Sequence, residues 1–304
     1  MKIVFIGGVQ FSHAILETIL NENFSIEAIF SYDKSKEKNY SDYASFDDIS
    51  KQYKIKHFKV MNINDEKNIE LIRKIQPDLI LVMGWSQLLK DELLKIPQIG
   101  IIGSHPTELP KYRGRAPIPW SIIKGLRESA LTFFYITHDV DDGDILIQKK
   151  FKINLNDDAT SIYKKIIELG KKMISECLPL LESGTAKRIP QNSLDFVENW
   201  PKRTPEDGKI NWSKPAKEID TLIRASTHPY PGAFTFLHGS KIIIWKSTLL
   251  ESKNKEIGKI IHIDNDGIHV GTGKNILIIH TFSVDNGNSL KTMSKKNTGT
   301  SFEN

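Results

Sequence analysis

The stretch Leu79-Ile80-Leu81-Val82-Met83-Gly84 decides the fold, because its apolar run has no polar face to turn toward water. A strand that is apolar on both faces is typical of a parallel sheet covered on both sides. On either side of it, similar short runs occur at residues 2–6, 26–30, 55–60 and 99–102, and apolar residues at helical spacing fill 11–19 and 63–75. This alternation predicts an α/β fold, an open and mostly parallel sheet with helices on both faces.

The rest of the chain predicts a second, smaller domain. Residues 159–182 have helical spacing and are expected to form a long helix on the Rossmann-like sheet. Residues 185–208 contain several prolines among polar residues, which is the composition of a linker. Short strands between turn signals then predict a small C-terminal β-barrel of the oligonucleotide-binding (OB-like) type. The predicted domains are 1–184, which carries the chemistry, a linker at 185–208, and an OB-like β domain at 209–304.

Composition excludes several classes of protein. The 304 residues are 39% hydrophobic and 26% charged, which is typical of a globular chain and not of a disordered one. A single cysteine, Cys177, excludes a disulfide scaffold. No apolar run is long enough for a membrane span or a signal-peptide core, so a cytoplasmic protein without a membrane partner is expected. The net charge of +5 is small for a dedicated nucleic-acid binder and suits an anionic ligand equally well.

Several common cofactor motifs are missing from the sequence. Gly7-Gly8 follows the first predicted strand, but the glycine fingerprint of a dinucleotide site and a Walker loop are absent, which favours a plain tight turn. The histidines show no zinc spacing. The acidic residues at 139–144 lie next to a predicted strand and not between helices, which favours a metal-free turn over a calcium loop. We therefore expect no metal.

His105 stands out by its position. It follows the apolar run at 99–102, at the carboxyl edge where open α/β sheets bind their ligands. Residues 106–117 contain prolines, a glycine and basic side chains, and this composition predicts a rigid irregular loop that presents charge. A capping histidine in a surface loop is the alternative interpretation.

Two motifs taken together resemble a known family. The motifs are His105-Pro106-Thr107-x-Leu109-Pro110-x-Tyr112-Arg113-Gly114 and, about 30 residues later, Asp141-x-Gly143-x-Ile145. They are similar to the signature of the formyltetrahydrofolate-dependent formyltransferases, which include methionyl-tRNA formyltransferases and sugar-nucleotide N-formyltransferases. Residues 83–89 resemble the family's loop beside the folate, and residues 208–212 and 229–233 resemble the start of its C-terminal barrel. The resemblance implies N10-formyltetrahydrofolate as co-substrate.

The resemblance also implies roles for single residues. His105 matches the family's general base, and Asp141 matches the acid that orients it. An amine that attacks a formyl carbon must lose one proton, and an imidazole titrates close enough to neutral pH to accept it. The family has an Asn two residues before the His, whereas this chain has Gly103. Either Ser104, a backbone N–H group or water donates to the formyl oxygen in its place, or the enzyme is slower.

Two sets of binding residues follow from the same resemblance. The folate set is Met83, Gly84, Trp85, Gln87, Leu88, Leu89, Ile136, Thr137, Val140 and Asp141. The substrate set is Thr107, Tyr112, Arg113, Gly114, Arg115 and Pro117. The two arginines suit an anionic substrate, because a planar guanidinium binds phosphate through two hydrogen bonds.

The acceptor amine is predicted to belong to a nucleotide-linked 4-amino sugar for surface-glycan biosynthesis. Residues 111–120 resemble the sugar-nucleotide enzymes. Residues 33–43, where the tRNA enzymes carry a basic insertion, balance their lysines with acids, so nucleic acid is not expected as a partner. A methionyl-tRNA formyltransferase is the alternative, and a folate or nucleotide-sugar sensor without activity is a second one. The small barrel is open to substrate binding, a homodimer interface or a scaffold role.

Overall fold

The computed structural model describes residues 1–35, 41–192, 195–253, 256–285 and 297–303. The chain forms two compact units. The first unit comprises residues 1–117, 127–153 and 163–201, and the second comprises residues 118–126, 154–162 and 202–304. Within the described residues, no helix is long and apolar enough to cross a membrane.

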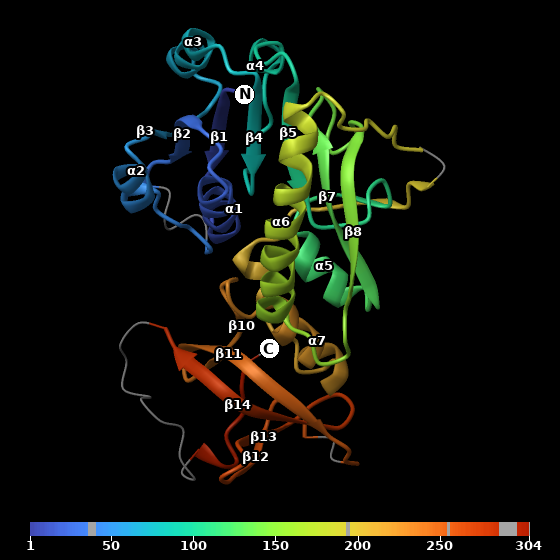
Figure 1. The fold of residues 1–304 in the computed structure, drawn as a ribbon. Coiled ribbons are helices and arrows are strands. Elements are labelled where there is room, and N and C mark those ends of the chain that lie inside the picture. Colours follow the sequence, from blue (N-terminus) through green and yellow to red (C-terminus); the bar gives the residue numbers. More distant parts are fainter. Residues whose placement is uncertain (36–40, 193–194, 254–255, 286–296, 304) are drawn as a thin grey trace. The chain divides into compact units, whose positions relative to one another are not determined.

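A seven-stranded sheet forms the centre of the first unit (Figure 1). Its strand order is β3-β2-β1-β4-β5-β7-β8, in which the neighbours among the first five strands are parallel and β7 and β8 are antiparallel to theirs. These strands are β1 (Ile3–Gly7), β2 (Ile26–Tyr32), β3 (Lys56–Val60), β4 (Leu79–Met83), β5 (Gly100–His105), β7 (Glu128–Tyr135) and β8 (Ile145–Lys152). The predicted open, mostly parallel α/β sheet is confirmed.

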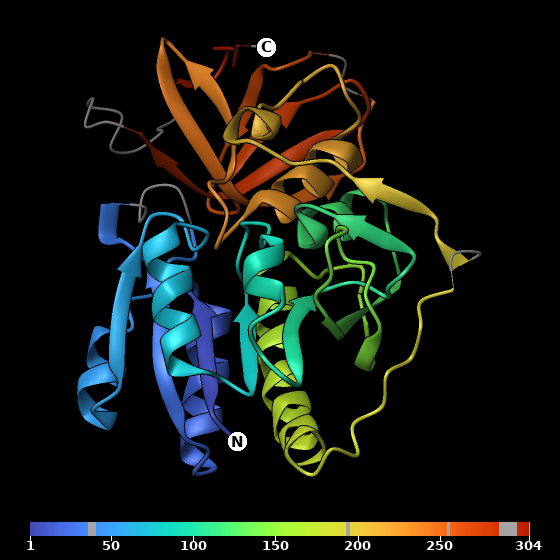
Figure 2. The same cartoon turned by 90° about the horizontal axis from the view of Figure 1, so that it is seen from above.

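Helices cover both faces of this sheet (Figures 1 and 2). They are α1 (Gln10–Asn21), α2 (Asp47–Tyr53), α3 (Glu66–Ile75), α4 (Asp91–Leu94) and the part of α6 (Ala159–Glu182) from residue 163 onward. Because side chains alternate along a strand, Val4 and Val82 pack on one face with Ile72 of α3. On the other face α6 lies against α1, since a Cβ at Gly170 would come within 2.7 Å of the Phe11 ring.

The second unit is built on a five-stranded antiparallel sheet of order β10-β11-β14-β13-β12. Its strands are β10 (Ala233–Leu237), β11 (Ser240–Leu250), β12 (Ile260–Ile263), β13 (Ile268–Gly271) and β14 (Ile276–Val284). The unit also holds most of α5 (Pro117–Ile123), the short 3-10 helix η3 (Pro205–Gly208) and α7 (Ala216–Ser226). At the C-terminus, Glu303 bridges Phe236 of β10 and Ser301 bridges Lys259 just before β12, which connects the two edge strands. This arrangement confirms the small C-terminal β domain.

The segment from 185 to 208, predicted as a linker, is hydrogen-bonded to the first unit over part of its length. Ile189 and Ile145 exchange two backbone hydrogen bonds of 2.8 and 3.0 Å. Farther on, β9 (Glu198–Trp200) pairs in parallel with β6 (Tyr112–Gly114). Residues 118–126 and 154–162 belong to the second unit although they come earlier in the chain. The units therefore do not follow a single cut in chain order, because long-range pairing and not local composition defines them.

Candidate active site

His105 closes strand β5 at the carboxyl end of the parallel strands, and its side chain is 7% exposed. Its Nε2 atom lies 3.0 Å from the carbonyl oxygen of Tyr112. Because a carbonyl oxygen only accepts, Nε2 carries the proton in this contact. The Thr107 hydroxyl donates to the same carbonyl at 2.7 Å. The loop after β5 therefore fixes the orientation of the imidazole.

Asp141 brings a carboxylate to the other ring nitrogen. Its Oδ2 atom lies 3.6 Å from Nδ1 of His105 and accepts the N–H of Gly114 at 3.1 Å. Asp141 lies between β7 and β8 and has a φ of +54°, in the left-handed region that costs a residue with a Cβ about 1 kcal/mol. β7 is antiparallel to β5, with Tyr135 beside Ile102 and Thr132 beside His105, so the chain after β7 folds back along the sheet to bring Asp141 to His105. The structure thus brings the predicted His and Asp together.

A short strand pairing holds the loop that both residues contact. Gly114 in β6 has a φ of +105°, and a Cβ there would lie 2.4 Å from the carbonyl oxygen of Trp200 in β9, so the position requires glycine. Arg115 donates its backbone N–H to that carbonyl at 2.8 Å. The Tyr112 ring stacks on the Trp200 indole with centroids 4.7 Å apart. Backbone and ring contacts together fix the carbonyl that His105 uses.

The basic side chains of this loop contact protein acceptors. Arg113 Nη2 donates to Gln191 Oε1 at 2.9 Å, and Arg115 Nη2 donates to the carbonyl oxygen of Ser86 at 3.2 Å. Arg113 Nε is buried and has no hydrogen-bond partner in the part of the chain that the structure describes. Of the two arginines predicted to bind substrate, Arg115 is exposed and Arg113 is half-buried. Pro117, also in that set, begins α5.

Glu108 offsets the positive charge of the same loop. It pairs with Lys111 and with Lys150 of β8, each at 3.0 Å. Burial raises the pKa of the Glu108 carboxyl, but the hydrogen bonds from Lys150 and Lys111 lower it, and the net pKa lies below its ordinary value. The Glu108 carboxylate is therefore charged at neutral pH and pairs with one lysine of its own loop and one of β8.

Gly103 leaves a space beside His105 that another side chain fills. A Cβ at position 103 would lie 2.8 Å from the side chain of Ile136 and 3.4 Å from the Phe134 ring. Ile136 therefore packs where the family has its Asn side chain. Alternation along β5 places Ser104 on the face opposite Gly103 and His105, so the structure does not bring the Ser104 hydroxyl to the imidazole.

The two loops assigned to the folate lie next to each other. His138 Nδ1 in the loop after β7 lies 3.0 Å from an oxygen of Asp91, which directly follows the loop after β4. The hydrogen bond to Asp91 raises the pKa of His138. These loops expose large apolar side chains: Leu88 is 64% exposed and Val140 is 47% exposed. Val140 directly precedes Asp141, the partner of His105, and an exposed apolar side chain there suits an aromatic ligand. Thr137, in the same loop, donates to Asp142.

The loop after β4 is itself held firmly. The Trp85 indole stacks on Tyr32 with centroids 3.8 Å apart, and its Nε1 is buried without a hydrogen-bond partner among the described residues. The Gln87 side chain accepts the N–H of Ile63 and donates to the carbonyl of Met61, so it ties this loop to the segment after β3. Of the remaining predicted residues, Met83 and Leu89 are buried and Gly84 has a φ of +59°.

The turn after β1 uses its own N–H groups internally. Gly8 and Val9 donate to the Ser12 hydroxyl, Gln10 donates to the carbonyl of Asp42, and Phe11 donates to the Tyr163 hydroxyl, at 2.8 to 3.1 Å. These donors would otherwise be available to a phosphate. The acceptor Asp42 belongs to the segment 33–43, of which residues 36–40 lie outside the described residues. The described residues also hold no cluster of His, Cys, Asp or Glu side chains suited to a metal ion.

Sequence reasoning missed two residues of this site, Gln191 and Trp200. Both lie in the segment predicted as a linker. Trp200 is only 3% exposed, and a tryptophan inside a polar, proline-containing stretch is a signal that the stretch packs against something. Gln191 carries no such signal, because its role depends on which backbone groups lie around it.

Comparison with known proteins assigns the chain to a family. Residues 1–178 match the family model described as formyl transferase, and residues 202–297 match the formyl transferase C-terminal domain. The chain belongs to the formyl transferase family. This formyl transferase is 34% identical over 282 residues to the methionyl-tRNA formyltransferase of Alkaliphilus oremlandii, an alignment that covers 92% of this chain and 90% of that protein. Other curated relatives, such as that of Clostridioides difficile, have the same name.

Solved structures of similar fold include an N-formyltransferase from Helicobacter canadensis in complex with folinic acid and dTDP-3-aminofucose. Its TM-score is 0.69 at 20% identity, over 93% of this chain and 100% of that one. HypX from Aquifex aeolicus in complex with tetrahydrofolic acid has a TM-score of 0.69 at 18% identity, and the match spans 93% of this formyl transferase and 44% of HypX. At these identities the likeness establishes the fold.

Proposed function

We propose that this formyltransferase moves a formyl group from N10-formyltetrahydrofolate to a primary amine, with His105 as the base and Asp141 as its partner. The observation that carries the proposal is the 3.6 Å separation of His105 Nδ1 and Asp141 Oδ2 at the carboxyl end of β5. The exposed apolar side chains of Leu88 and Val140, on the two adjoining loops, support a site there for the ring system of the folate.

The hydrogen bonds of His105 indicate which nitrogen acts. Nε2 is committed as a donor to the Tyr112 carbonyl, so Nδ1 is the atom that can accept a proton. When the amine nitrogen bonds to the formyl carbon, it must release one proton, while the nitrogen that loses the formyl group must gain one. A proton on Nδ1 makes an imidazolium that the Asp141 carboxylate stabilises. The imidazolium can return this proton to the departing nitrogen, so the step balances without a metal.

The acceptor that we propose first is the amino group of methionyl-tRNA. The support comes from relatives named methionyl-tRNA formyltransferase, which align with this chain along nearly its whole length at 34% and 32% identity. The nucleotide-linked amino sugar is kept as a second candidate. It is supported by the sequence of residues 111–120 and by the structural likeness to the enzyme bound to dTDP-3-aminofucose.

One experiment with parallel incubations tests both acceptors. The purified protein is incubated with N10-formyltetrahydrofolate and either methionine-charged initiator tRNA or UDP- and dTDP-linked 4-amino sugars. We expect formyl-methionyl-tRNA to accumulate. Formylation of the sugar nucleotide alone would overturn the first acceptor and favour the second. Tight folate binding without turnover on either acceptor would point to the sensor.

A further inference from the structure

Gln191 connects three parts of the candidate site through one side chain. Its Nε2 atom donates to the carbonyl oxygens of Asp141 at 2.9 Å and Gly143 at 2.8 Å. Its Oε1 atom accepts from Arg113 Nη2 at 2.9 Å. The residue itself is anchored, because Ile189 two positions earlier exchanges two backbone hydrogen bonds with Ile145.

The chemistry of these contacts fits an amide and no other common side chain. An amide offers two N–H donors and a carbonyl acceptor, and here both donors and the acceptor are used. A glutamate of the same length can accept from Arg113 but cannot donate to the two carbonyls. A methionine of similar length can do neither. The amide is half-buried, so a lost hydrogen bond leaves backbone carbonyls with less compensation from water.

The loop that Gln191 holds is one that would otherwise relax. Asp141 has a φ of +54°, which is unfavourable for a residue with a Cβ. Gly143 is so close to the preceding strand that a Cβ there would lie 1.8 Å from the carbonyl oxygen of Tyr135. Such backbone persists only where surrounding contacts fix it. The two carbonyls that Gln191 binds belong to these two residues, so its amide fixes the segment that carries the Asp141 carboxylate.

We propose that Gln191 is a positioning residue for formyl transfer: it holds the Asp141 loop so that the carboxylate stays 3.6 Å from His105, and it ties Arg113 to the same loop. This inference rests on the proposed roles of His105 and Asp141. Gln191 acts through Asp141, so its contribution to turnover exists only while Asp141 is a carboxylate.

A double-mutant cycle in formyl transfer tests this dependence. Turnover is measured for wild type, Gln191→Met, Asp141→Asn and the double variant, with saturating acceptor. We expect Gln191→Met to lower kcat by roughly 10- to 100-fold with the KM for N10-formyltetrahydrofolate changed by less than about 3-fold. In the Asp141→Asn background, the same substitution is expected to lower kcat by less than about 2-fold.

Two further variants separate positioning from stability. Gln191→Glu keeps the length and an acceptor for Arg113, and it is expected to lose as much kcat as Gln191→Met. Asn68→Leu removes another amide that donates to a backbone carbonyl, that of Asn62 at 2.7 Å, and is expected to lower the melting temperature while kcat is kept.

The outcomes distinguish this inference from the proposed function. Wild-type kcat in Gln191→Met, or the same loss of kcat in both backgrounds, would overturn the positioning role while leaving the His–Asp pair intact. Wild-type kcat in Asp141→Asn would instead overturn the proposed function, and the positioning role with it.

Discussion

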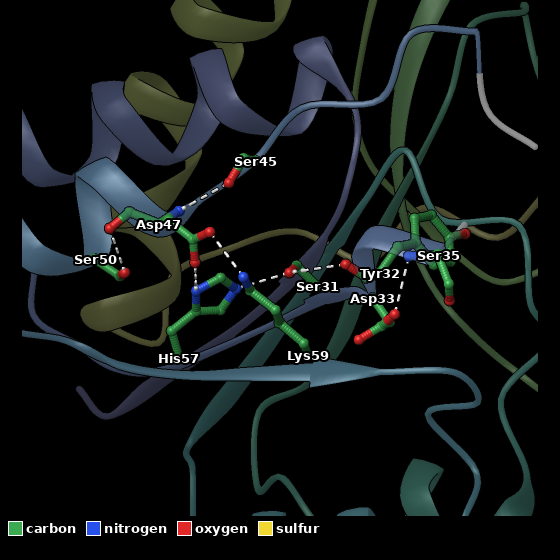
Figure 3. A network of polar contacts seen from close by, with 9 residues as sticks. All are labelled: Ser31, Tyr32, Asp33, Ser35, Ser45, Asp47, Ser50, His57 and Lys59. Atoms are coloured by element: carbon green, nitrogen blue, oxygen red, sulfur yellow. Dashed lines mark hydrogen bonds and ion pairs between the residues drawn. The ribbon is translucent and has the colours of Figure 1, made fainter. Parts of the chain in front are cut away.

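Two histidines of the seven-stranded sheet, His57 and His105, each lie beside a carboxylate from outside the sheet, and the two pairs differ in their surroundings. His57 Nδ1 lies 3.3 Å from Asp47 Oδ1, and its Nε2 lies 2.7 Å from the Ser31 hydroxyl, as Figure 3 shows. The His105–Asp141 separation is 3.6 Å, and both histidine side chains are about equally buried, at 8% and 7% exposed. By distance and burial alone, His57 is the better match to a nucleophile–base–acid arrangement.

The surroundings decide otherwise. Ser31 is 2% exposed and lies in β2, and His57 lies in the neighbouring strand β3, so both belong to the body of the sheet. Lys59 binds the second oxygen of Asp47 at 2.7 Å, and that hydrogen bond lowers the pKa of the Asp47 carboxyl (Figure 3). Both ring nitrogens of His57 therefore have partners within the body of the fold, Asp47 at Nδ1 and Ser31 at Nε2. His105 instead ends its strand, beside loops that expose apolar side chains.

The largest expected effect is the loss of turnover in His105→Ala. Removing the proton acceptor should lower kcat for formyl transfer by roughly 10²- to 10⁴-fold, the usual contribution of a general base. The matched variant His57→Ala removes the other imidazole and should keep kcat, although it should melt at a lower temperature. Equal losses of kcat in the two variants would contradict the assignment of His105 as the base, because both losses would then reflect damage to the fold.

A second prediction concerns the backbone of the Asp141 loop. In Gly143→Ala the new Cβ would lie 1.8 Å from a backbone oxygen, so the loop must shift, and we expect a loss of roughly 2–4 kcal/mol in the free energy of unfolding together with a lower kcat. Gly125→Ala is the control. A Cβ at Gly125 is disfavoured by the backbone, whose φ is +66°, but it would meet no other atom within 4 Å. Its expected cost is about 1 kcal/mol without a change in kcat. Denaturant unfolding of both variants measures the difference.

The third prediction uses the pKa of His57. Burial lowers this pKa below its ordinary value of 6.5, against the opposing effect of Asp47. The unfolded chain therefore binds a proton more readily than the folded one just below pH 6.5, so the free energy of unfolding should fall as the pH falls through that window. The contribution is at most about 1.4 kcal/mol per pH unit for a single proton. Compared with wild type, His57→Gln should show a weaker dependence between pH 7 and pH 5; an unchanged slope would contradict the assignment.

The smallest expected effect is at Asp42. Burial raises the pKa of the Asp42 carboxyl, and the hydrogen bond from the Tyr163 hydroxyl lowers it only in part. Its folded form favours the proton, so this group stabilises the fold at low pH and loses that contribution as the pH rises through the raised pKa. Asp42→Asn keeps an acceptor for Tyr163 and should raise the free energy of unfolding at pH 7 by less than about 1 kcal/mol. The gain should shrink toward pH 4, and a loss of stability at pH 7 would be the opposite result.

The sequence predicted the parts of the fold that depend on local pattern. The run that became β4 and the long helix α6 appear within a residue or two of their predicted limits, because burial on both faces of a strand and helical spacing are visible in a short window. By contrast, no helical pattern marks α2, which begins at Asp47 shortly after the polar segment 33–43.

What the sequence could not show depends on pairing between distant segments. β6 and β9 are three residues each and lie in proline-containing stretches, so neither reads as a strand until the other is placed beside it. His57 and Asp47 likewise lie in polar surroundings where no spacing marks them as a pair. For His105 and Asp141 the resemblance supplied what local pattern did not, and Ser104 shows the limit, since alternation along β5 turns it away from the imidazole.

The most direct test of the central claim is the kcat of the double variant His105→Ala/Asp141→Asn in formyl transfer, compared with each single variant. If the imidazole and the carboxylate act as one unit, the double variant should be no slower than His105→Ala within about 2-fold, because the carboxylate has no partner left to act on. Losses that multiply, or a double variant that turns over like wild type, would contradict the account.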